Sequence, residues 1–477
     1  MILTVAQDFP VPSATFEAST YTKWQKKYES SKKALLDVEV TDVNGSPDYI
    51  KMTRIDLVGN AAERGYAHGY LLALEIFHFF KDLDVLYMQM IMSIDVSRFP
   101  ENVQKILNAL KAKGAANAPQ FFNTAYKYIY ESESKYFPQY LVDEMNGIGE
   151  GICAFLGHEC QGDHDVEHWK NQVKYFNMFP ELIKMTCTAI GAWGKAVKNQ
   201  SGSDLIHLLT HSLTHSLTHL LTCSGLLQVR ALDFGSGPWS NNTIVYVYKD
   251  NTDASFNSFV AVSFPGFVGA ITGMSDKGIA ISEKVWMINN PEPHDDDGLQ
   301  PGSYDGEADC FVLRDILQHA KNRKEAEDYL QSVKRTWGIW MGVGDYESQQ
   351  FDLVGYQMDS AIAYNDVTMP SMTGQPYMEN ICYVDKHPQP SWDNPNGTLP
   401  TALAAFYGSI DTESMKQILA YHETGDVHIA LYDFVTKNML IAIGKTNAAG
   451  EYGSDNTEWS AFNRPYVNFN LQDLFAN

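Results

Sequence analysis

The segments Met185-Thr-Cys-Thr-Ala-Ile-Gly-Ala192 and Gln228-Val-Arg-Ala-Leu-Asp-Phe-Gly235 decide the fold of this chain. The first has the pattern of a small-residue strand that opens on Cys187, and the second is a strand that carries Arg230 and Asp233 in an Arg-x-x-Asp motif. A cysteine that becomes a chain terminus has both a thiol and a free α-amine, so one residue supplies a nucleophile and a base. The two segments predict cysteine-dependent amide chemistry.

The sequence pattern changes at Cys187. Before it, helical spacing is found in residues 61–83, 103–110, 123–133 and 140–156. After it come short β-rich runs at residues 243–248, 258–264, 279–285, 380–384 and 428–434, interrupted by expected helices at 309–332 and 412–422. This order predicts an α+β fold in which two sheets are sandwiched between helical layers, with a helical N-terminal part over 1–186 and a catalytic part over 187–477.

Composition excludes several classes of function. The 477 residues are 44% hydrophobic, enough for a large core. The formal charge of −23 and the absence of a Lys/Arg cluster argue against nucleic acid and against constitutive binding to anionic membranes. No apolar run reaches the roughly 18 to 20 residues that span a bilayer, and residues 1–20 lack a signal-peptide core.

Other signals bear on the compartment. Four sequons for N-glycosylation begin at Asn44, Asn199, Asn241 and Asn396. These sequons favour a lysosomal or secreted protein. The lack of a signal-peptide core in residues 1–20 argues against that compartment. The six cysteines are too few and too scattered for a disulfide framework, although a pair or two could bridge, and none forms a Cys-x-x-Cys metal pair.

A low-complexity insertion over residues 207–227 repeats a Leu-Thr-His-Ser unit. Its histidines His211, His215 and His219 are four residues apart, but no acidic residue or cysteine with ligand spacing completes a metal site, so we predict none. The insertion would lie in or beside the hairpin that joins the two catalytic strands. Cys223 is the rival nucleophile, yet it is so close to Arg230 that little length remains for a hairpin.

With the insertion set aside, the two strands resemble acid ceramidase and its relatives among the cysteine N-terminal-nucleophile amidases. Four further segments resemble this family in order along the chain: 63–69 and 143–151 its pro-part and small-subunit helices, 263–275 its glycine-rich wall strand, and 281–284 its strand with a catalytic-site glutamate. The similarity extends from about residue 57 to residue 434, and the order of the segments carries it. The resemblance implies a four-layer αββα N-terminal-nucleophile hydrolase sandwich.

The resemblance also implies a mechanism. Cys187 would cut the bond after Thr186 in cis, giving a small and a large subunit, and its thiolate would then attack an acyl carbon to form a thioester. Arg230 and Asp233 would hold the substrate amide and the new N-terminus, and they share a face only if the strand bulges or ends between them. Glu283 would be a hydrogen-bonding partner during self-cleavage.

The expected substrate is the amide of a fatty or other apolar acyl group, such as a ceramide or an N-acyl amine, with transient contact to lipid vesicles. No cofactor or metal is implied. An apolar slot near the thiol would be lined by Phe264, Phe267, Val268, Ile271 and Met274. Within this group we take Phe267 and Met274 as substrate-binding residues, together with Gly273 of the wall strand and Asp385.

Two features depart from the family. Where the family has an asparagine as an oxyanion donor, this chain has Asp385, so Asn380, Lys386 or Gln389 would have to donate instead. The family also uses a second arginine downstream of that position, and none occurs here between Arg335 and Arg464.

Alternatives remain open on the same fold. One is a phospholipase-B-like ester hydrolase, and another is an acyltransferase like the penicillin side-chain enzyme. A third is a non-processing binding protein whose catalytic hairpin the insertion has disrupted. His68 is interpreted as a helix-packing residue, and residues 421–428 as a helix end capped by Gly425 and followed by a strand rather than as a metal cluster.

Overall fold

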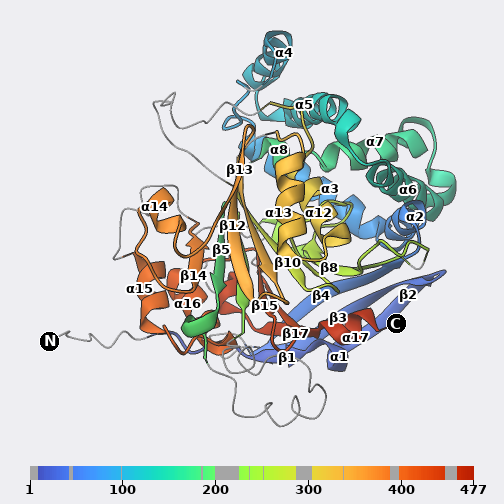
Figure 1. Ribbon diagram of the computed structural model, residues 1–477. Helices are drawn as coiled ribbons and strands as arrows, with labels where there is room; N and C mark the ends of the chain where they lie inside the picture. Colours follow the sequence, from blue (N-terminus) through green and yellow to red (C-terminus); the bar gives the residue numbers. More distant parts are fainter. Residues whose placement is uncertain are drawn as a thin grey trace.

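The computed structural model describes residues 9–41, 47–97, 99–183, 186–198, 225–235, 237–250, 252–285, 303–336, 338–386, 397–445 and 459–476. Two sheets form its centre (Figure 1). The seven-stranded sheet has the order β1 (Thr15–Glu17), β17 (Tyr466–Asn470), β16 (Asn438–Ile443), β15 (His428–Asp433), β6 (Leu227–Asp233), β5 (Thr186–Ala192) and β14 (Ile381–Val384). The ten-stranded sheet has the order β13 (Ala361–Tyr364), β12 (Gln350–Tyr356), β11 (Ile339–Asp345), β10 (Ile279–Val285), β9 (Thr272–Ser275), β8 (Phe259–Ser263), β7 (Ile244–Lys249), β4 (Pro47–Val58), β3 (Ser31–Thr41) and β2 (Thr22–Tyr28).

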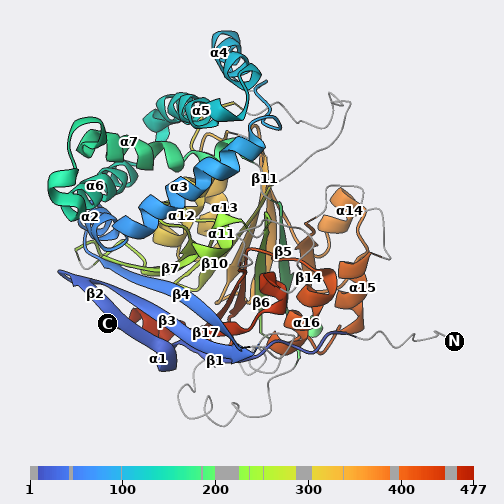
Figure 2. The same ribbon diagram turned by 180° about the vertical axis from the view of Figure 1, so that it is seen from behind.

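Helices cover the outer faces of both sheets (Figures 1 and 2). On the side of the ten-stranded sheet are α2 (Ala61–Leu71), α3 (Ala73–Met90), α4 (Glu101–Ala112), α5 (Ala118–Glu133), α6 (Gln139–Leu156), α7 (Val166–Phe176), α8 (Phe179–Leu182), α12 (Asp309–His319) and α13 (Arg323–Ser332). On the other side are α14 (Met369–Thr373), α15 (Thr398–Ala405) and α16 (Thr412–His422). Shorter helices are α1 (Ala18–Tyr21), α11 (Pro238–Asn241) and α17 (Leu471–Phe475).

Three hydrophobic cores separate the layers. One lies between the two sheets and includes Val260 and Ala430. A second packs the outer face of the seven-stranded sheet against α15 and α16 and includes Val229 and Ile418. The third packs the ten-stranded sheet against the helices of the first third of the chain and α12. Because helices, sheet, sheet and helices follow one another, the predicted α+β class and αββα sandwich are confirmed.

The N-terminal residues extend both sheets, which the sequence-based prediction did not include. Strand β4 pairs in parallel with β7, and β1 pairs in parallel with β17. In β3, Leu36, Val38 and Val40 alternate with polar residues and are buried between the sheets. The expected helices over 61–83, 103–110, 123–133 and 140–156 are present, but they begin only after β4. The division at Thr186 into two subunits stays a prediction.

The two strands that carry the predicted catalytic residues Cys187 and Arg230 are neighbours. Strands β5 and β6 pair antiparallel in a continuous register that sets Cys187 opposite Leu232 and Ala189 opposite Arg230. The segment between them, residues 199–224, lies outside the described residues, and so do Cys223 and nearly all of the predicted insertion 207–227. The sequons at Asn44, Asn199 and Asn396 also lie outside them, whereas Asn241 is exposed at the end of α11.

The structure also bears on the expected disulfides and on membrane-spanning segments. Cys153 and Cys160 form a disulfide, and the free cysteines among the described residues are Cys187, Cys310 and Cys382. Within the described ranges, no helix is both long enough and apolar enough to cross a membrane.

The glycines of the segments 63–69 and 143–151 allow α2 and α6 to pack backbone to backbone. A Cβ added to Gly65 would lie 2.1 Å from the Glu144 carbonyl oxygen, and one added to Gly151 would lie 2.1 Å from the Tyr66 carbonyl oxygen. Neither contact involves a flexible side chain that could move away. The helical glycines are therefore explained by close packing of two helices.

We expect Gly151→Ala to lower the free energy of unfolding by about 1–3 kcal/mol, because overpacking outweighs the helix propensity gained. Ala154→Leu, on the exposed part of the same helix, is the control and should change stability little. Urea unfolding followed by circular dichroism measures both. Equal stability of Gly151→Ala and the parent protein would contradict this close packing.

Candidate active site

Cys187, Arg230 and Glu283 meet where the two sheets face each other. Arg230 Nη2 lies 3.3 Å from Cys187 Sγ and 3.1 Å from Glu283 Oε2, and Cys187 Sγ lies 3.7 Å from the same carboxylate oxygen. Cys187 and Arg230 come from the paired strands β5 and β6, whereas Glu283 comes from β10 of the opposite sheet. The structure thus brings together three of the four residues predicted to be catalytic.

Burial controls the charge state of this triangle. Cys187 and Arg230 have no exposed surface, and Glu283 is 5% exposed. Burial raises the pKa of the Cys187 thiol well above its usual range, and although Arg230 opposes this rise, the Glu283 carboxylate adds to it. Burial also raises the pKa of Glu283, against the effect of Arg230. In the uncut chain, Cys187 is therefore a protonated thiol that donates to the Glu283 carboxylate.

Asp233 lies on the other face of β6. Its carboxylate accepts hydrogen bonds from Thr424 Oγ1 at 2.6 Å and from the Gly425 backbone N–H at 2.7 Å. Because the register of β6 contains no bulge, Arg230 and Asp233 do not share a face. The backbone of Asp233 still lies beside the predicted cleavage point, since its carbonyl accepts from Thr186 Oγ1 at 2.9 Å.

A second carboxylate supports the same turn. Asp426 accepts from the backbone N–H groups of Phe234, at 2.8 Å, and of Gly235, at 2.7 Å. Burial and the neighbouring Asp426 charge raise the pKa of Asp233, while Lys386 opposes the rise, and burial likewise raises the pKa of Asp426. These two adjacent carboxylates, of which Asp233 is buried and Asp426 half-buried, therefore take up protons more readily in the folded protein than in the unfolded chain.

This pair predicts a pH dependence of stability. Carboxyl groups with raised folded-state pKa values stabilise the fold at low pH, and this contribution is lost as the pH rises above the ordinary aspartate pKa of about 3.9 and through the raised values. The thermal unfolding midpoint should therefore be higher at pH 5 than at pH 7, and the difference should shrink in Asp426→Asn. Calorimetry at both pH values measures it, and an unchanged difference in the variant would contradict the raised pKa values.

His428, at the start of β15, is a site residue that the sequence did not reveal. Its Nε2 lies 3.0 Å from Arg230 Nη1 and 3.2 Å from Thr272 Oγ1. Arginine only donates, so Nε2 accepts and the proton is on Nδ1. Burial and the Arg230 charge lower the pKa of His428 well below its usual range, which keeps the ring neutral. His428 thus fixes the guanidinium group from outside the Cys187–Glu283 pair.

We expect His428→Phe to slow the predicted self-cleavage at Cys187 on the order of 10- to 100-fold, because a hydrogen bond to a charged group is worth about 1.5–3 kcal/mol. His428→Gln retains an acceptor oxygen and should recover part of the rate. Gel quantification of the uncut chain over time measures both variants. Equal rates for the Phe and Gln variants, both below that of the parent, would reduce His428 to a packing residue.

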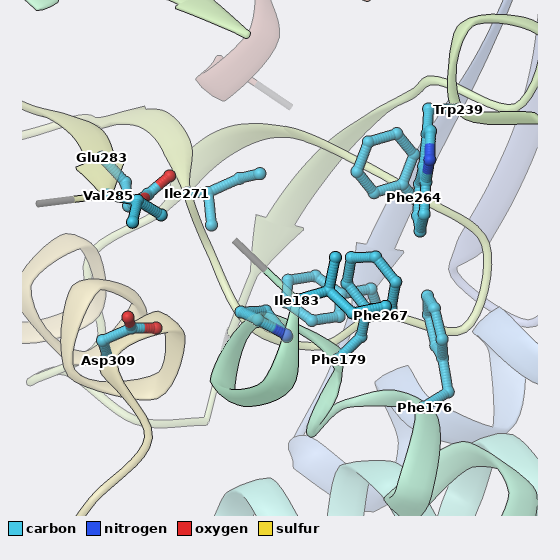
Figure 3. A pocket seen from close by; sticks show the side chains of 11 residues that line it. Phe176, Phe179, Ile183, Trp239, Phe264, Phe267, Ile271, Glu283, Val285 and Asp309 are labelled. Atoms are coloured by element: carbon cyan, nitrogen blue, oxygen red, sulfur yellow. The ribbon is translucent and has the colours of Figure 1, made fainter. Parts of the chain in front are cut away.

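A narrow apolar cavity adjoins Glu283 (Figure 3). It has a volume of about 20 Å³, room for roughly one water molecule. Its lining residues are Phe176, Phe179, Pro180, Ile183, Trp239, Phe264, Phe267, Ile271, Glu283, Val285 and Asp309. Phe267, predicted to bind substrate, is therefore part of the wall.

The other three residues predicted to bind substrate lie elsewhere. Met274 is packed in the core between the sheets, and Gly273 faces α12, where an added Cβ would lie 2.6 Å from a methyl carbon of Leu317. Asp385 lies 2.8 Å from the His422 ring. None of these three lines the cavity beside Glu283.

The remaining candidates have the following positions. For the oxyanion donor, Asn380 uses its side-chain oxygen to accept from the Lys195 backbone N–H, Lys386 donates to the Glu423 carbonyl, and Gln389 lies outside the described residues. His68 is buried, and its Nε2 accepts from the Gly266 N–H at 3.0 Å, which agrees with a packing role.

Two further predictions concern metal binding. Helix α16 ends at His422 and β15 begins at His428, as predicted for residues 421–428, but the helix is capped by Glu423 in the left-handed conformation and not by Gly425. Within the described residues no group of three or more His, Cys, Asp or Glu side chains could hold a metal ion.

No family model matches the chain. Protein dcd1B of Dictyostelium discoideum is 27% identical over 445 residues, covering 90% of this chain and 76% of its own length, and protein dcd1A of the same organism is 28% identical over 444 residues, covering 90% and 87%.

Solved structures show weaker likeness. The Caenorhabditis elegans N-acylethanolamine-hydrolyzing acid amidase ortholog has a TM-score of 0.35 and 14% identity, covering 52% of this chain and 93% of that one. A variant of the conjugated bile acid hydrolase from Clostridium perfringens has a TM-score of 0.33 and 8% identity, covering 59% and 96%. At TM-scores below 0.5 these likenesses carry no argument about activity.

Two sheets between helical layers make the fold of this protein a four-layer αββα sandwich. This is the architecture that its sequence resemblance to the N-terminal-nucleophile hydrolases implies. Its relatives dcd1A and dcd1B share most of its length, at an identity below 30%.

Proposed function

We propose that this protein is an autoprocessed cysteine N-terminal-nucleophile hydrolase that cleaves the amide bond of a lipid-like N-acyl substrate through a thioester. The observation that carries the proposal is the contact of Cys187 Sγ with both the Arg230 guanidinium and the Glu283 carboxylate. A thiol beside a base and a fixed positive charge is the arrangement that nucleophilic catalysis requires.

Self-cleavage would begin at the bond between Thr186 and Cys187. Glu283 takes the thiol proton, and Sγ attacks the Thr186 carbonyl carbon. As the C–S bond forms and the C–N bond breaks, the Cys187 nitrogen takes up a proton and becomes a free amine. Water then hydrolyses this thioester, releasing the Thr186 carboxylate and restoring the thiol.

Substrate hydrolysis would repeat these steps on an external amide. The new α-amine of Cys187 takes the thiol proton and later gives it to the leaving amine, while the acyl group passes to Sγ. Water hydrolyses the acyl thioester to the carboxylic acid. Arg230 stabilises the negative charge that develops on sulfur and oxygen, and Asp233 holds the ammonium form of the new N-terminus.

An apolar acyl group is favoured by the walls of the adjoining cavity. Phe179, Trp239, Phe264, Phe267 and Ile271 provide aromatic and aliphatic surface next to Glu283 (Figure 3). Such a wall gives up no hydrogen bonds when a hydrocarbon chain replaces water.

The test is hydrolysis of N-acyl 4-nitroanilides at mildly acid pH by purified protein, followed by the colour of released 4-nitroaniline. We expect activity that Cys187→Ala abolishes and that Cys310→Ala and Cys382→Ala retain, because these two buried cysteines lie outside the site. Activity that survives in Cys187→Ala would overturn the proposal. Hydrolysis of 4-nitrophenyl esters alone would assign the chain to the ester hydrolases.

A further inference from the structure

A large groove lies among the helices that cover the ten-stranded sheet. It has a volume of about 720 Å³ and is formed mainly by side chains of α3, α5 and α7. This volume falls within the roughly 300–1,000 Å³ of typical small-molecule sites. The groove is separate from the catalytic triangle, and nothing in the sequence pattern pointed to it.

Phe176 forms a wall shared by the groove and the cavity beside Glu283. On the groove side its ring centroid lies 5.1 Å from that of Phe80, and on the cavity side 5.9 Å from that of Phe267. Phe176 is the last residue of α7, so its position depends on a helix end rather than on a helix interior. Among the described residues, Phe176 is therefore the one that lines both spaces.

The two spaces differ in size, and only the groove has room for a long hydrocarbon chain. The cavity beside Glu283 holds about 20 Å³, far too little for a long hydrocarbon chain. The groove behind Phe176 is large enough, and its floor includes the stacked rings of Tyr87 and Phe122, whose centroids lie 4.1 Å apart. A long acyl chain attached at Cys187 would need this space.

The rim of the groove indicates a neutral ligand. Lys81 is the only lysine or arginine among the lining residues that the structure describes, and Asp84 and Glu159 oppose its charge. His164 and His168 also line the groove, and burial and the neighbouring His164 lower the pKa of His168. A phosphate or sulfate headgroup would find no cluster of cations here. The chemistry fits an unbranched hydrocarbon chain joined to a neutral amide.

We propose that the groove between α3, α5 and α7 binds the hydrocarbon chain of the substrate's acyl group, which reaches Cys187 past a displaced Phe176 ring. This inference rests on the proposed function, because it places the acyl carbon of an amide at Cys187. It adds a selectivity for long chains that the catalytic triangle alone does not provide.

The test fills the groove with an indole ring. Gln172 is half-buried in the wall and Gln120 is exposed at it, so Gln172→Trp and Gln120→Trp should narrow the groove without removing a catalytic group. Gln472→Trp, on an exposed position of α17 away from the groove, is the matched control. Circular dichroism shows which variants fold like the parent.

Each variant is assayed on N-hexadecanoyl and N-butanoyl 4-nitroanilide. We expect kcat/KM for the hexadecanoyl substrate to fall at least tenfold in both groove variants, with the butanoyl value unchanged within twofold and no change in Gln472→Trp. An unaltered ratio of the two substrates in folded groove variants would overturn the proposal, even though the hydrolase function would stand.

A binding measurement separates this proposal from the hydrolase function. Calorimetric titration of hexadecanamide into Cys187→Ala protein needs no turnover, and we expect the Kd to rise at least tenfold when Gln172→Trp is added. Even if the parent protein hydrolysed no amide, this rise in Kd would still support the proposal that the groove binds a hydrocarbon chain. Equal affinity in both proteins would overturn it.

Discussion

Cys187→Ala protein is expected to remain one uncut chain and to hydrolyse N-acyl amides at less than roughly a thousandth of the parent rate. The size of the effect follows because removing a nucleophile abolishes the covalent route as a whole, and what remains is substrate binding and Arg230 electrostatics. The Cys187 side chain touches both Arg230 and Glu283, so no other described thiol can take its place. Gel mobility and the 4-nitroanilide assay measure the two losses.

The control for this variant is Cys382→Ala. Cys382 is a fully buried free cysteine of β14, like Cys187 in burial, but its Sγ contacts the Tyr364 carbonyl at 3.8 Å. Its replacement should reduce stability modestly and leave cleavage intact. Loss of cleavage in both variants would trace the defect to the fold and not to the nucleophile.

Glu144→Gln should have the largest effect on stability. Glu144 is fully buried in α6, 3.0 Å from Arg314 Nη2 and 3.6 Å from Arg64 Nη2. Removing one partner from a buried ionic cluster leaves the other charges uncompensated, which lowers the free energy of unfolding by about 3–5 kcal/mol. Arg64 retains Asp250 at 3.1 Å and Arg314 retains the Val268 carbonyl at 2.6 Å, so the fold weakens rather than disappears.

The matched control is Glu150→Gln on the same helix. Glu150 pairs with Lys170 at 2.9 Å and its side chain is 49% exposed, so its loss should change stability by less than about 1 kcal/mol. Urea unfolding of both variants at neutral pH decides the question. Similar midpoints for the two glutamine variants would contradict a buried ionic cluster at Glu144.

This cluster also spans the predicted division of the chain. Glu144 belongs to the part before Cys187, and Arg314, in α12, belongs to the part after it. After self-cleavage, the ion pair would join two separate polypeptides. We therefore expect the cut form of Glu144→Gln to separate into two pieces at lower urea concentrations than the cut parent protein.

The sequence predicted the site residues best where their positions follow from the strands on which they lie. Cys187 and Arg230 meet because their strands pair, and Glu283 meets them because β10 lies opposite. His428 could not be found in this way, since its role depends on a hydrogen bond to a neighbouring strand that local sequence does not encode. The same holds for Phe176, whose importance comes from two spaces that only the folded helices create.

Positions that depend on the choice between two buried faces were harder to predict. Gly273 and Met274 are consecutive residues of β9 and face opposite sides of a sheet that is covered on both. Neither side faces the cavity. The sequence-based prediction does not include the strands β2 and β3, because the strong helical spacing after β4 is the dominant signal in the first third of the chain. The alternation of Leu36, Val38 and Val40 could have indicated them.

The central claim is that Cys187 becomes an N-terminal nucleophile. The most direct measurement is intact mass with N-terminal sequencing of the purified parent protein after incubation at mildly acid pH. The account predicts two polypeptides, one of them beginning at Cys187. A chain that stays whole, or a new N-terminus at Cys223, would contradict it.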